Sequence, residues 1–323
     1  MCTAVSFLQE NHYFGRNLDL EFSYHESVAI LPRNYPLLMR CTGSINEHYA
    51  MIGIATVDNG YPLYYDATNE YGLSMAGLNF PGNAVYHSPA DCTINIAPFE
   101  LIPWVLGQCK NISQVLDLLK NVQVSAIPYS EELSLTPLHW IVSDKHQSIV
   151  LEPMRDGLHI IEDPVGILTN SPPFDFHMQN LRQYLSLTSK EPESRFSNLS
   201  SLTPFSRGAG AFGLPGDNTS TSRFIRAAFT KLHSVCESNE NSRVYQFFHI
   251  LQSVSQKRGT VQVGSQYEIT VYSSCCNTDL GIYYYTTYEN SQITAVHMRN
   301  EDLDSTKVIQ YPLVLSTQIR TVN

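Results

Sequence analysis

Short β segments, gathered in three separate parts of the chain, constrain its fold most strongly. The first part holds apolar and β-branched runs at 27–31, 51–57, 62–67 and 74–78, the second at 138–142, 148–151, 158–161 and 166–169, and the third at 267–274, 282–287 and 293–298. Segments with helical periodicity lie between these parts, at 99–106, 112–119, 175–185, 221–232 and 244–254. Strands, then helices, then strands again predict an α+β protein whose two antiparallel sheets carry helices on their outer faces.

Apolar spacing also predicts which faces of the helices are buried. In the segment 112–119, the apolar side chains of Ile112, Val115, Leu116 and Leu119 fall on one face, and Asn111 or Ser113 is placed to cap the helix. In the segment 244–254, Phe247, Phe248 and Leu251 are expected to point inward. The stretch 186–221 is rich in Ser, Pro and Gly, which predicts a flexible loop or an arm that orders against another subunit.

The N-terminal stretch predicts a β-hairpin that carries a reactive cysteine. An apolar run from Ala4 to Leu8 is followed by a polar break and by a second run at 13–19, which would return alongside Cys2. Met1 precedes a small side chain, which peptidases that remove the initiator methionine commonly tolerate. Its removal would leave Cys2 with a free amine whose pKa is about 7.7–8.0, next to a thiol that reacts as the thiolate.

A thiol paired with its own terminal amine is a known catalytic arrangement. The amine accepts the thiol proton and later delivers it to the leaving nitrogen of an amide. In the returning strand, Arg16 would lower the pKa of the thiol and Asp19 would orient the amine. Without this context, Cys2 would be read as an ordinary buried cysteine, and Arg16 with Asp19 as a surface ion pair.

Several longer motifs carry a resemblance that spans nearly the whole chain. They are MCTA (1–4), FGRNLDLEFSY (14–24), PRNY (32–35), NEYGLSMAGLNFPG (69–82), LTNSPPFDFHMQNL (168–181), GLPGDNTSTSRFIRAAF (213–229), YSSCCN (272–277) and GIYYYTTYENSQI (281–293). Together they resemble the choloylglycine hydrolase family, which comprises bile salt hydrolases and penicillin V acylases. LNFPGNA (78–84), PFELIPWVLGQC (98–109) and GLPGD (213–217) are closer to the bile salt hydrolases of gut Gram-positive bacteria.

This resemblance implies a four-layer αββα sandwich of the N-terminal nucleophile hydrolase type. It also implies hydrolysis of the amide bond of glycine- or taurine-conjugated bile salts through a thioester on Cys2. Asn170, at a turn before two prolines, and Asn79, after a strand, would supply the oxyanion hole, and Arg223 would stabilise the thiolate and Asp19. Turn chemistry alone would also explain both asparagines.

A substrate pocket is expected near these motifs. Apolar or aromatic residues at loops and strand ends would suit a large, flat acyl group such as a steroid, with core packing as the alternative for each: Leu18, Phe22, Tyr24, Tyr65, Ile127, Tyr129 and Leu133. Arg207 would meet the anionic end of the conjugate. The family likeness further implies that the stretch 186–221 supports a homotetramer.

Composition excludes several classes of partner. A net charge of −10 argues against nucleic acid and an anionic membrane surface, and the sequence shows neither a secretory leader nor a stretch long enough to span a membrane. A cytoplasmic enzyme is therefore expected. Seven scattered cysteines without a paired motif indicate neither a disulfide scaffold nor a zinc site, and no cofactor is expected. Motifs spread from residue 2 to residue 290 favour a single domain, 1–323.

Three other functions remain open. Penicillin V acylase is one, and a broader N-acyl amidase is another. The third is a non-catalytic protein that retains Met1 and uses the scaffold only to bind an amphipathic molecule. A Cys–His dyad through His139 is disfavoured, because the terminal amine already supplies a base and His139 sits in an apolar strand.

Overall fold

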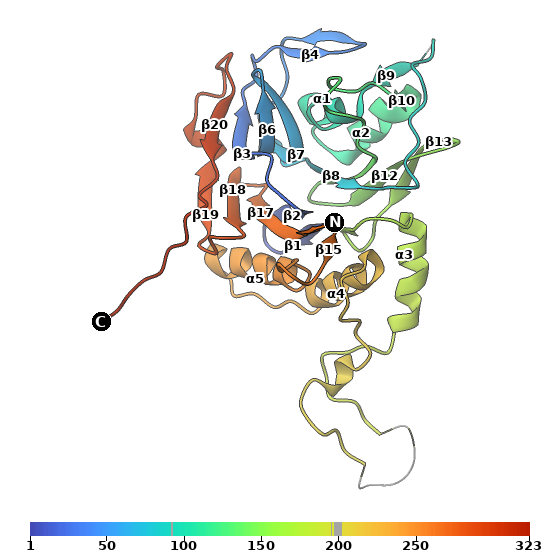
Figure 1. Ribbon diagram of the computed structural model, residues 1–323, viewed down its shortest axis with the longest axis vertical. Helices are drawn as coiled ribbons and strands as arrows, with labels where there is room; N and C mark the ends of the chain where they lie inside the picture. The colour runs from blue at the N-terminus through green and yellow to red at the C-terminus, as the bar shows by residue number, and fades with distance from the viewer. Residues whose placement is uncertain (92, 195, 197–201) are drawn as a thin grey trace.

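A computed structural model describes residues 1–323 except 92, 195 and 197–201. The chain forms an α+β sandwich of two antiparallel sheets between two layers of helices (Figure 1), which confirms the fold expected from the sequence. Six cysteines are free thiols, and Cys92 lies outside the described residues.

The first sheet contains the N-terminal hairpin at its centre. Its strand order is β14 (Ile167–Leu168), β1 (Cys2–Leu8), β2 (His12–Leu20), β17 (Ile269–Asn277), β18 (Ile282–Thr287) and β19 (Thr294–His297). Strand β1 therefore pairs on both sides, with β14 and with β2. Strand β2 lies so close to β17 at position 15 that only glycine fits. A Cβ atom on Gly15 would lie 2.0 Å from the carbonyl oxygen of Ser274.

The second sheet is larger and is built mostly from the middle of the chain. Its strand order is β13 (Gly157–Glu162), β12 (Ser148–Met154), β11 (Leu138–Ser143), β8 (Ser74–Asn79), β7 (Tyr61–Asn69), β6 (Met51–Asp58), β3 (Ser27–Leu31) and β20 (Ile309–Pro312). Three short pairs lie outside both sheets: β4 (Leu37–Met39) with β5 (Gly43–Ile45), β9 (Ile94–Ile96) with β10 (Val122–Val124), and β15 (Gln262–Val263) with β16 (Gln266–Tyr267). The sequence did not predict these pairs or β20, since such short strands carry little periodicity.

Helices cover the outer face of each sheet. Helices α4 (Ser220–Leu232) and α5 (Glu240–Gln252) pack on the first sheet, and α3 (Phe174–Leu181) packs beside α4. Helix α1 (Leu101–Gln108) packs on the second sheet, with α2 (Ile112–Leu118) in the same layer (Figure 1). Short 3-10 turns extend or join these helices, at Pro98–Glu100, Leu119–Asn121, Arg182–Tyr184, Ala209–Ala211 and Met298–Asn300.

Two apolar cores follow from this layering. One core combines both inner faces of the sheets with α4 and α5, and it includes Phe247, Phe248 and Leu251, as predicted. The other lies between the second sheet and α1 with α2. The prediction for α2 was wrong at Leu116, which is exposed, because the buried face of this short helix is completed by Ile112, Val115 and Leu119. Of the two candidate caps, Asn111 accepts from the backbone of Gln114.

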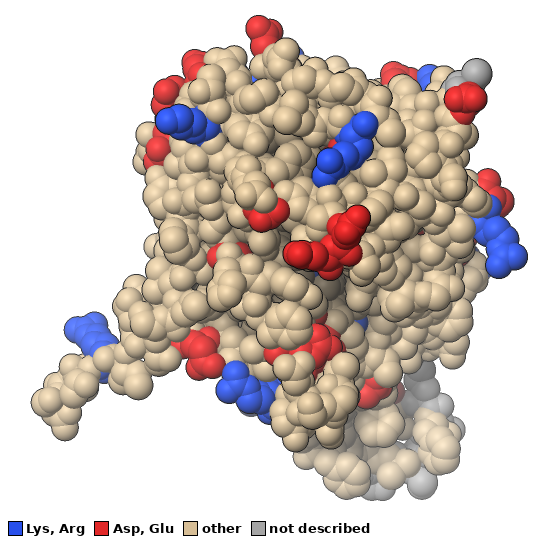
Figure 2. All heavy atoms as spheres, turned by 45° about the horizontal axis from the view of Figure 1, so that its top comes forward, with Lys and Arg blue, Asp and Glu red and all other residues tan. Residues whose placement is uncertain are grey.

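Charged side chains on the surface agree with the acidic composition of the chain. Charged side chains are scattered over the face in Figure 2, where the basic ones stand apart from one another. No helix in the described part of the chain is long and apolar enough to cross a membrane. Between α3 and α4, described residues of the stretch 186–221 form an arm that projects from the body (Figure 1), while residues 220 and 221 already belong to α4.

Candidate active site

The first residues of β1 form the centre of the candidate site. Cys2 pairs with Leu18 across the hairpin, as the sequence predicted, and it is 3% exposed. Strand β2 holds the backbone of Cys2 on one side, and β14 pairs with the same strand two residues further on, at Ala4 and Val5. The sulfur therefore starts from a rigid strand and not from a loop, which is what a precisely placed nucleophile requires.

Asn170 and Arg223 converge on Cys2 from two other elements. The side-chain oxygen of Asn170, just after β14, accepts a hydrogen bond from the backbone nitrogen of Cys2 at 2.7 Å. Arg223, on the first turns of α4, donates to that same oxygen at 2.7 Å, to the carbonyl oxygen of Cys2 and to Thr3 Oγ1. Burial lowers the pKa of Arg223, which Asp19 and Cys2 partly offset.

Asn79 lies next to Asn170 at the end of β8. The side-chain nitrogen of Asn170 donates to the backbone oxygen of Asn79 at 2.7 Å. The side-chain oxygen of Asn79 is buried and makes no hydrogen bond within the described residues. Ser220 and His177 hold the backbone of Asn170, through its nitrogen at 2.8 Å and its oxygen at 2.9 Å respectively. The side chain of Asn170 thus bridges the backbone of Asn79 and the backbone of Cys2.

Arg16 and Asp19 are fully buried on β2, so neither forms a surface ion pair. Arg16 donates to the backbone oxygen of Tyr65 at 2.9 Å, while its Nη2 atom is left without a hydrogen-bond partner in the described structure. Burial pulls the pKa of Arg16 down, but the nearby Cys2, Tyr272, Asp66 and Asp19 outweigh it and the pKa is raised. A guanidinium group held in this way stays charged beside the thiol.

The Asp19 carboxyl group faces the same cluster. Burial raises its pKa, while the N-terminal amine, Arg223, Thr270 and Arg16 act against that rise. Thr270 donates to its Oδ1 atom at 2.6 Å, and Oδ2 has no hydrogen-bond partner among the described residues. Asp19 therefore presents one free oxygen inside the site.

Met1 occupies the space directly before Cys2. Its carbonyl oxygen accepts from the backbone nitrogen of Asp19 at 3.0 Å, and its amine donates to the backbone oxygen of Asp19 at 2.9 Å. The amine also forms an ion pair with Glu268. Met1 thus continues β1 by one residue and fills the position that a free Cys2 amine would face.

The candidate pocket residues fall into two groups. Phe22 and Tyr24 are half-exposed with ring centroids 4.9 Å apart, and Tyr65 is linked to this group through Thr56, which bonds the Tyr65 hydroxyl and the Tyr24 backbone. Because Tyr65 also holds Arg16, this group lies next to the catalytic candidates. Leu18, in contrast, is 3% exposed and belongs to the core, which was the alternative to a place in the pocket.

Tyr129 belongs to a second aromatic group. Its ring packs against Tyr61 and Phe99, with centroids 6.0 and 5.2 Å away, and its hydroxyl donates to Asp58 at 2.9 Å. Ile127 and Leu133 lie on the same loop, partly buried and exposed respectively. This group lies where β6 turns into β7. Tyr61 of this group and Tyr65 of the first group are both on β7.

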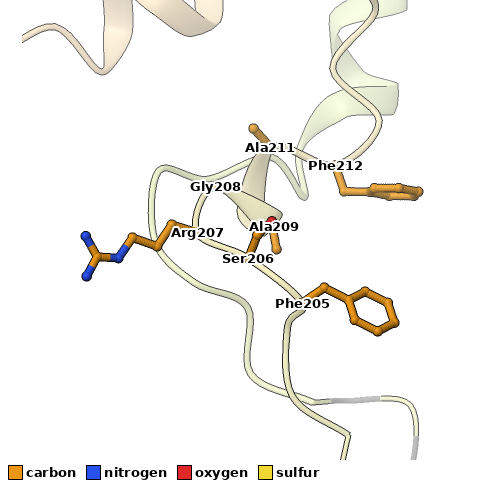
Figure 3. Close-up of a pocket in the computed structure, with 7 residues that line it drawn as sticks. All are labelled: Phe205, Ser206, Arg207, Gly208, Ala209, Ala211 and Phe212. Atoms are coloured by element: carbon orange, nitrogen blue, oxygen red, sulfur yellow. The ribbon is translucent and has the colours of Figure 1, made fainter.

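Arg207 is not placed near Cys2 within one chain. It lies on the arm, which projects away from the N-terminus (Figure 1), beside a hollow lined by Phe205, Ser206, Gly208, Ala209, Ala211 and Phe212. Figure 3 shows the Arg207 side chain pointing away from the rings of Phe205 and Phe212. The contact between Arg207 and the anionic end of a conjugate stays a prediction.

His139 has both ring nitrogens engaged elsewhere. One nitrogen lies 3.2 Å from Glu152 and the other 2.9 Å from the backbone oxygen of Thr169, and the ring stacks on Phe80 at 4.1 Å between centroids. No group of three or more metal-ligating side chains occurs among the described residues. The chemistry available here is that of a thiol, a backbone amine and fixed hydrogen-bond donors.

Sequence reasoning missed several residues that build the site. Thr3, Ser220 and Thr270 contact the candidates directly, and Glu268 contacts the Met1 amine. Polar residues at alternate positions of an apolar strand, as at Glu268 and Thr270, are a usable signal because they share one face. Thr3 and Ser220 carry no comparable signal, since single hydroxyl residues are common at strand and helix starts.

Comparison with known proteins decides the family. The model of the linear amide C–N hydrolases, choloylglycine hydrolase family, matches residues 2–311. The chain belongs to this family. It is 50% identical over 324 residues to the bile salt hydrolase/transferase of Lactiplantibacillus plantarum, with all of both chains covered. It is 40% identical over 315 residues to the bile salt hydrolase/transferase of Bifidobacterium longum subsp. longum, with 96% of this chain and 99% of that protein covered.

Solved structures agree with this assignment. The conjugated bile acid hydrolase of Clostridium perfringens superposes with a TM-score of 0.92 at 36% identity, with all of both chains covered. Penicillin V acylase from Agrobacterium tumefaciens superposes with a TM-score of 0.76 at 17% identity, with 96% of this chain and 90% of that chain covered. This similarity shows that the two proteins share a fold. The protein is thus an amide C–N hydrolase of the N-terminal nucleophile type.

Proposed function

We propose that the protein hydrolyses the amide bond of glycine- or taurine-conjugated bile salts, with Cys2 as the nucleophile once Met1 has been removed. The observation that carries this proposal is the contact of one Asn170 oxygen with both the Cys2 nitrogen and Arg223. It supports the proposal because the Cys2 nitrogen, which removal of Met1 would turn into the terminal amine, is held by a buried carboxamide that Arg223 fixes in turn. The names of the bile salt hydrolase relatives supply the substrate class.

In the first half-reaction the Cys2 sulfur attacks the amide carbonyl. The Cys2 amine takes the thiol proton and passes it to the leaving nitrogen, so the C–N bond breaks and glycine or taurine leaves. The negative charge that develops on the carbonyl oxygen is stabilised by amide donors of Asn79 and Asn170, with Arg16 and Arg223 as the nearby fixed cations. Asp19 orients the amine from the strand opposite.

In the second half-reaction water attacks the thioester. The carbon–oxygen bond forms, the carbon–sulfur bond breaks, and the water proton returns through the amine to the sulfur, which releases the free bile acid. The half-exposed aromatic group of Phe22, Tyr24 and Tyr65 is the proposed contact surface for the steroid, since large apolar rings bind flat apolar ligands well. The group of Ile127, Tyr129 and Leu133 extends that surface.

One assay tests this function directly. The protein is incubated separately with glycocholate, taurocholate and penicillin V, and the released amine is quantified while intact mass reports whether Met1 is present. We expect amine release from the conjugated bile salts by the form that lacks Met1, and loss of at least about 10³-fold in rate for Cys2→Ala. Hydrolysis of penicillin V alone would assign the protein to that acylase activity instead. Full activity in the form that keeps Met1 would contradict the mechanism.

Assembly, domain organisation and location complete the proposal. The whole chain, 1–323, acts as one domain, and the arm joins four copies into a homotetramer. Supporting this, the aromatic rings of Phe205 and Phe212 on the arm are fully exposed, and exposed rings of this kind mark protein contacts. The enzyme works in the cytoplasm, where conjugated bile salts enter and free bile acids leave.

A further inference from the structure

We propose that Glu268 is a positioning residue for the second half-reaction: it holds the water that attacks the thioester, at the place where the Met1 amine now lies. This inference rests on the proposed function, because it assigns a role within the same thioester mechanism. Glu268 immediately precedes β17, and none of the roles given above to Cys2, Asn79, Asn170 or the two arginines involves it.

The contacts of Met1 define the proposed water site. The Met1 amine forms an ion pair with Glu268 Oε1 and donates to the backbone oxygen of Asp19 at 2.9 Å. Glu268 is 3% exposed, and within the described structure its Oε1 atom makes no hydrogen bond. The buried carboxylate is therefore matched to a group that leaves when Met1 is removed.

Removal of Met1 leaves a small polar space beside the nucleophile. A buried carboxylate without a partner is strongly disfavoured, so the space will take up a polar group. Water suits it, because one O–H bond can donate to Glu268 while the backbone nitrogen of Asp19, which bonded Met1, can donate to the water oxygen.

The same space is within reach of the reacting atoms. In the unprocessed chain the Met1 nitrogen is only three covalent bonds from the Cys2 nitrogen. The Cys2 sulfur is also three bonds from the Cys2 nitrogen, on the other side. A water held by Glu268 can therefore give its second proton to the Cys2 amine as its oxygen attacks the thioester carbon. The carbon–sulfur bond then breaks, and the amine proton passes to the sulfur.

This role separates the two half-reactions, which gives a sharp test with Glu268→Gln in the processed enzyme and taurocholate as substrate. The value of kcat/KM reports the steps up to amine release, so it should stay within about threefold of wild type. In contrast, kcat should fall about 10- to 100-fold because the water is misplaced. Taurine should appear in a burst equal to the enzyme concentration, ahead of cholate. Added hydroxylamine, which attacks the thioester without needing this site, should restore turnover and yield the hydroxamate.

Controls distinguish this role from a structural one. Glu240→Gln removes another partly buried carboxylate, which bonds Asn277 at the far end of β17, and it should show no burst. Glu268→Asp should recover part of the lost kcat. If kcat and kcat/KM of Glu268→Gln fall together without a burst, Glu268 acts on the Cys2 amine during acylation and the inference is wrong. If wild type releases no taurine or glycine at all, the proposed function fails instead.

Discussion

Arg223 and Asn170 lie 2.7 Å apart through Nη2 and Oδ1, and that oxygen also accepts from the Cys2 nitrogen. Arg223 donates as well to the carbonyl oxygen of Cys2. One guanidinium group thus sets the position of both the nucleophile's backbone and the carboxamide beside it. Because its donors are a rigid planar fork, no other side chain reproduces this set of contacts.

Arg223→Lys should lower kcat about 100-fold or more, since a lysine keeps the charge but cannot make the paired contacts that fix Asn170. Steady-state kinetics with a conjugated bile salt measures the effect. The matched control is Arg226→Lys, one turn further along α4, where the guanidinium group bonds the backbone oxygens of Pro215 and Asp217. Equal losses for the two variants would contradict the role given to Arg223.

Acid should destabilise the protein partly through His12. Burial lowers the pKa of His12 from its ordinary value of 6.5 to about 4. Between these two pH values the unfolded chain binds a proton that the folded chain excludes, so the free energy of unfolding falls as the pH drops from about 6.5 to about 4. Burial also lowers the pKa of His177 to about 4, so His177 acts in the same direction. At pH 5 the contribution of His12 amounts to about 2 kcal/mol.

Urea unfolding at pH 7.5 and pH 5 measures that contribution. His12→Gln should reduce the difference in unfolding free energy between the two pH values, whatever its effect on absolute stability, while the same substitution at the exposed His249 should leave the difference unchanged. Asp163 acts in the opposite direction, because burial raises the pKa of its carboxyl group to about 6. An unchanged pH difference in His12→Gln would show that the imidazole is already protonated in the folded state.

Gly15→Ala should destabilise the protein by roughly 3 kcal/mol or prevent folding, because its Cβ would lie 2.0 Å from the Ser274 carbonyl oxygen and the two strands would have to separate. Thermal unfolding measures the loss. Gly216→Ala is the control, since a Cβ atom there meets nothing within 4 Å. A stable Gly15→Ala variant would mean that β2 and β17 can move apart without cost.

Replacing the exposed rings of the arm should disrupt assembly. Phe205→Glu with Phe212→Glu places charges where apolar contact between copies is proposed, so the protein should elute as a smaller species in size-exclusion chromatography with light scattering. Val322→Glu, in the exposed C-terminal tail, should leave the mass unchanged. A tetramer that survives the double substitution would exclude the arm as its main contact.

Much of the fold was predictable because its long elements carry clear patterns. The turn at 9–11 between two apolar runs determined the hairpin, and the spacing of Phe247, Phe248 and Leu251 determined the buried face of α5. The short pairs such as β4 with β5 were missed, since three-residue strands are stabilised by their surroundings and not by their own sequence. The error at Leu116 has the same origin, because two turns of helix do not define a face well.

The site divides in a similar way. Arg16 and Asp19 follow from the hairpin register, because Arg16 lies two residues before Leu18, the partner of Cys2, and Asp19 lies one residue after it. Asn170 and Arg223 come from distant strands and helices, and only family resemblance suggested them. The alternation of Glu268 and Thr270 shows that they share a face, but the placement of Thr270 opposite Asp19 depends on the pairing of β17 with β2, which includes an irregularity between Thr270 and Tyr272.

The contacts of Met1 at the start of β1 also govern how the protein can be handled. Residues added before Cys2 would have to leave along the path of Met1, between the Asp19 backbone and Glu268, and would keep the amine from forming. The opposite end of the chain extends freely from the body (Figure 1), with its last residues exposed. Purification tags, surface tethers and fusion partners therefore belong after Asn323.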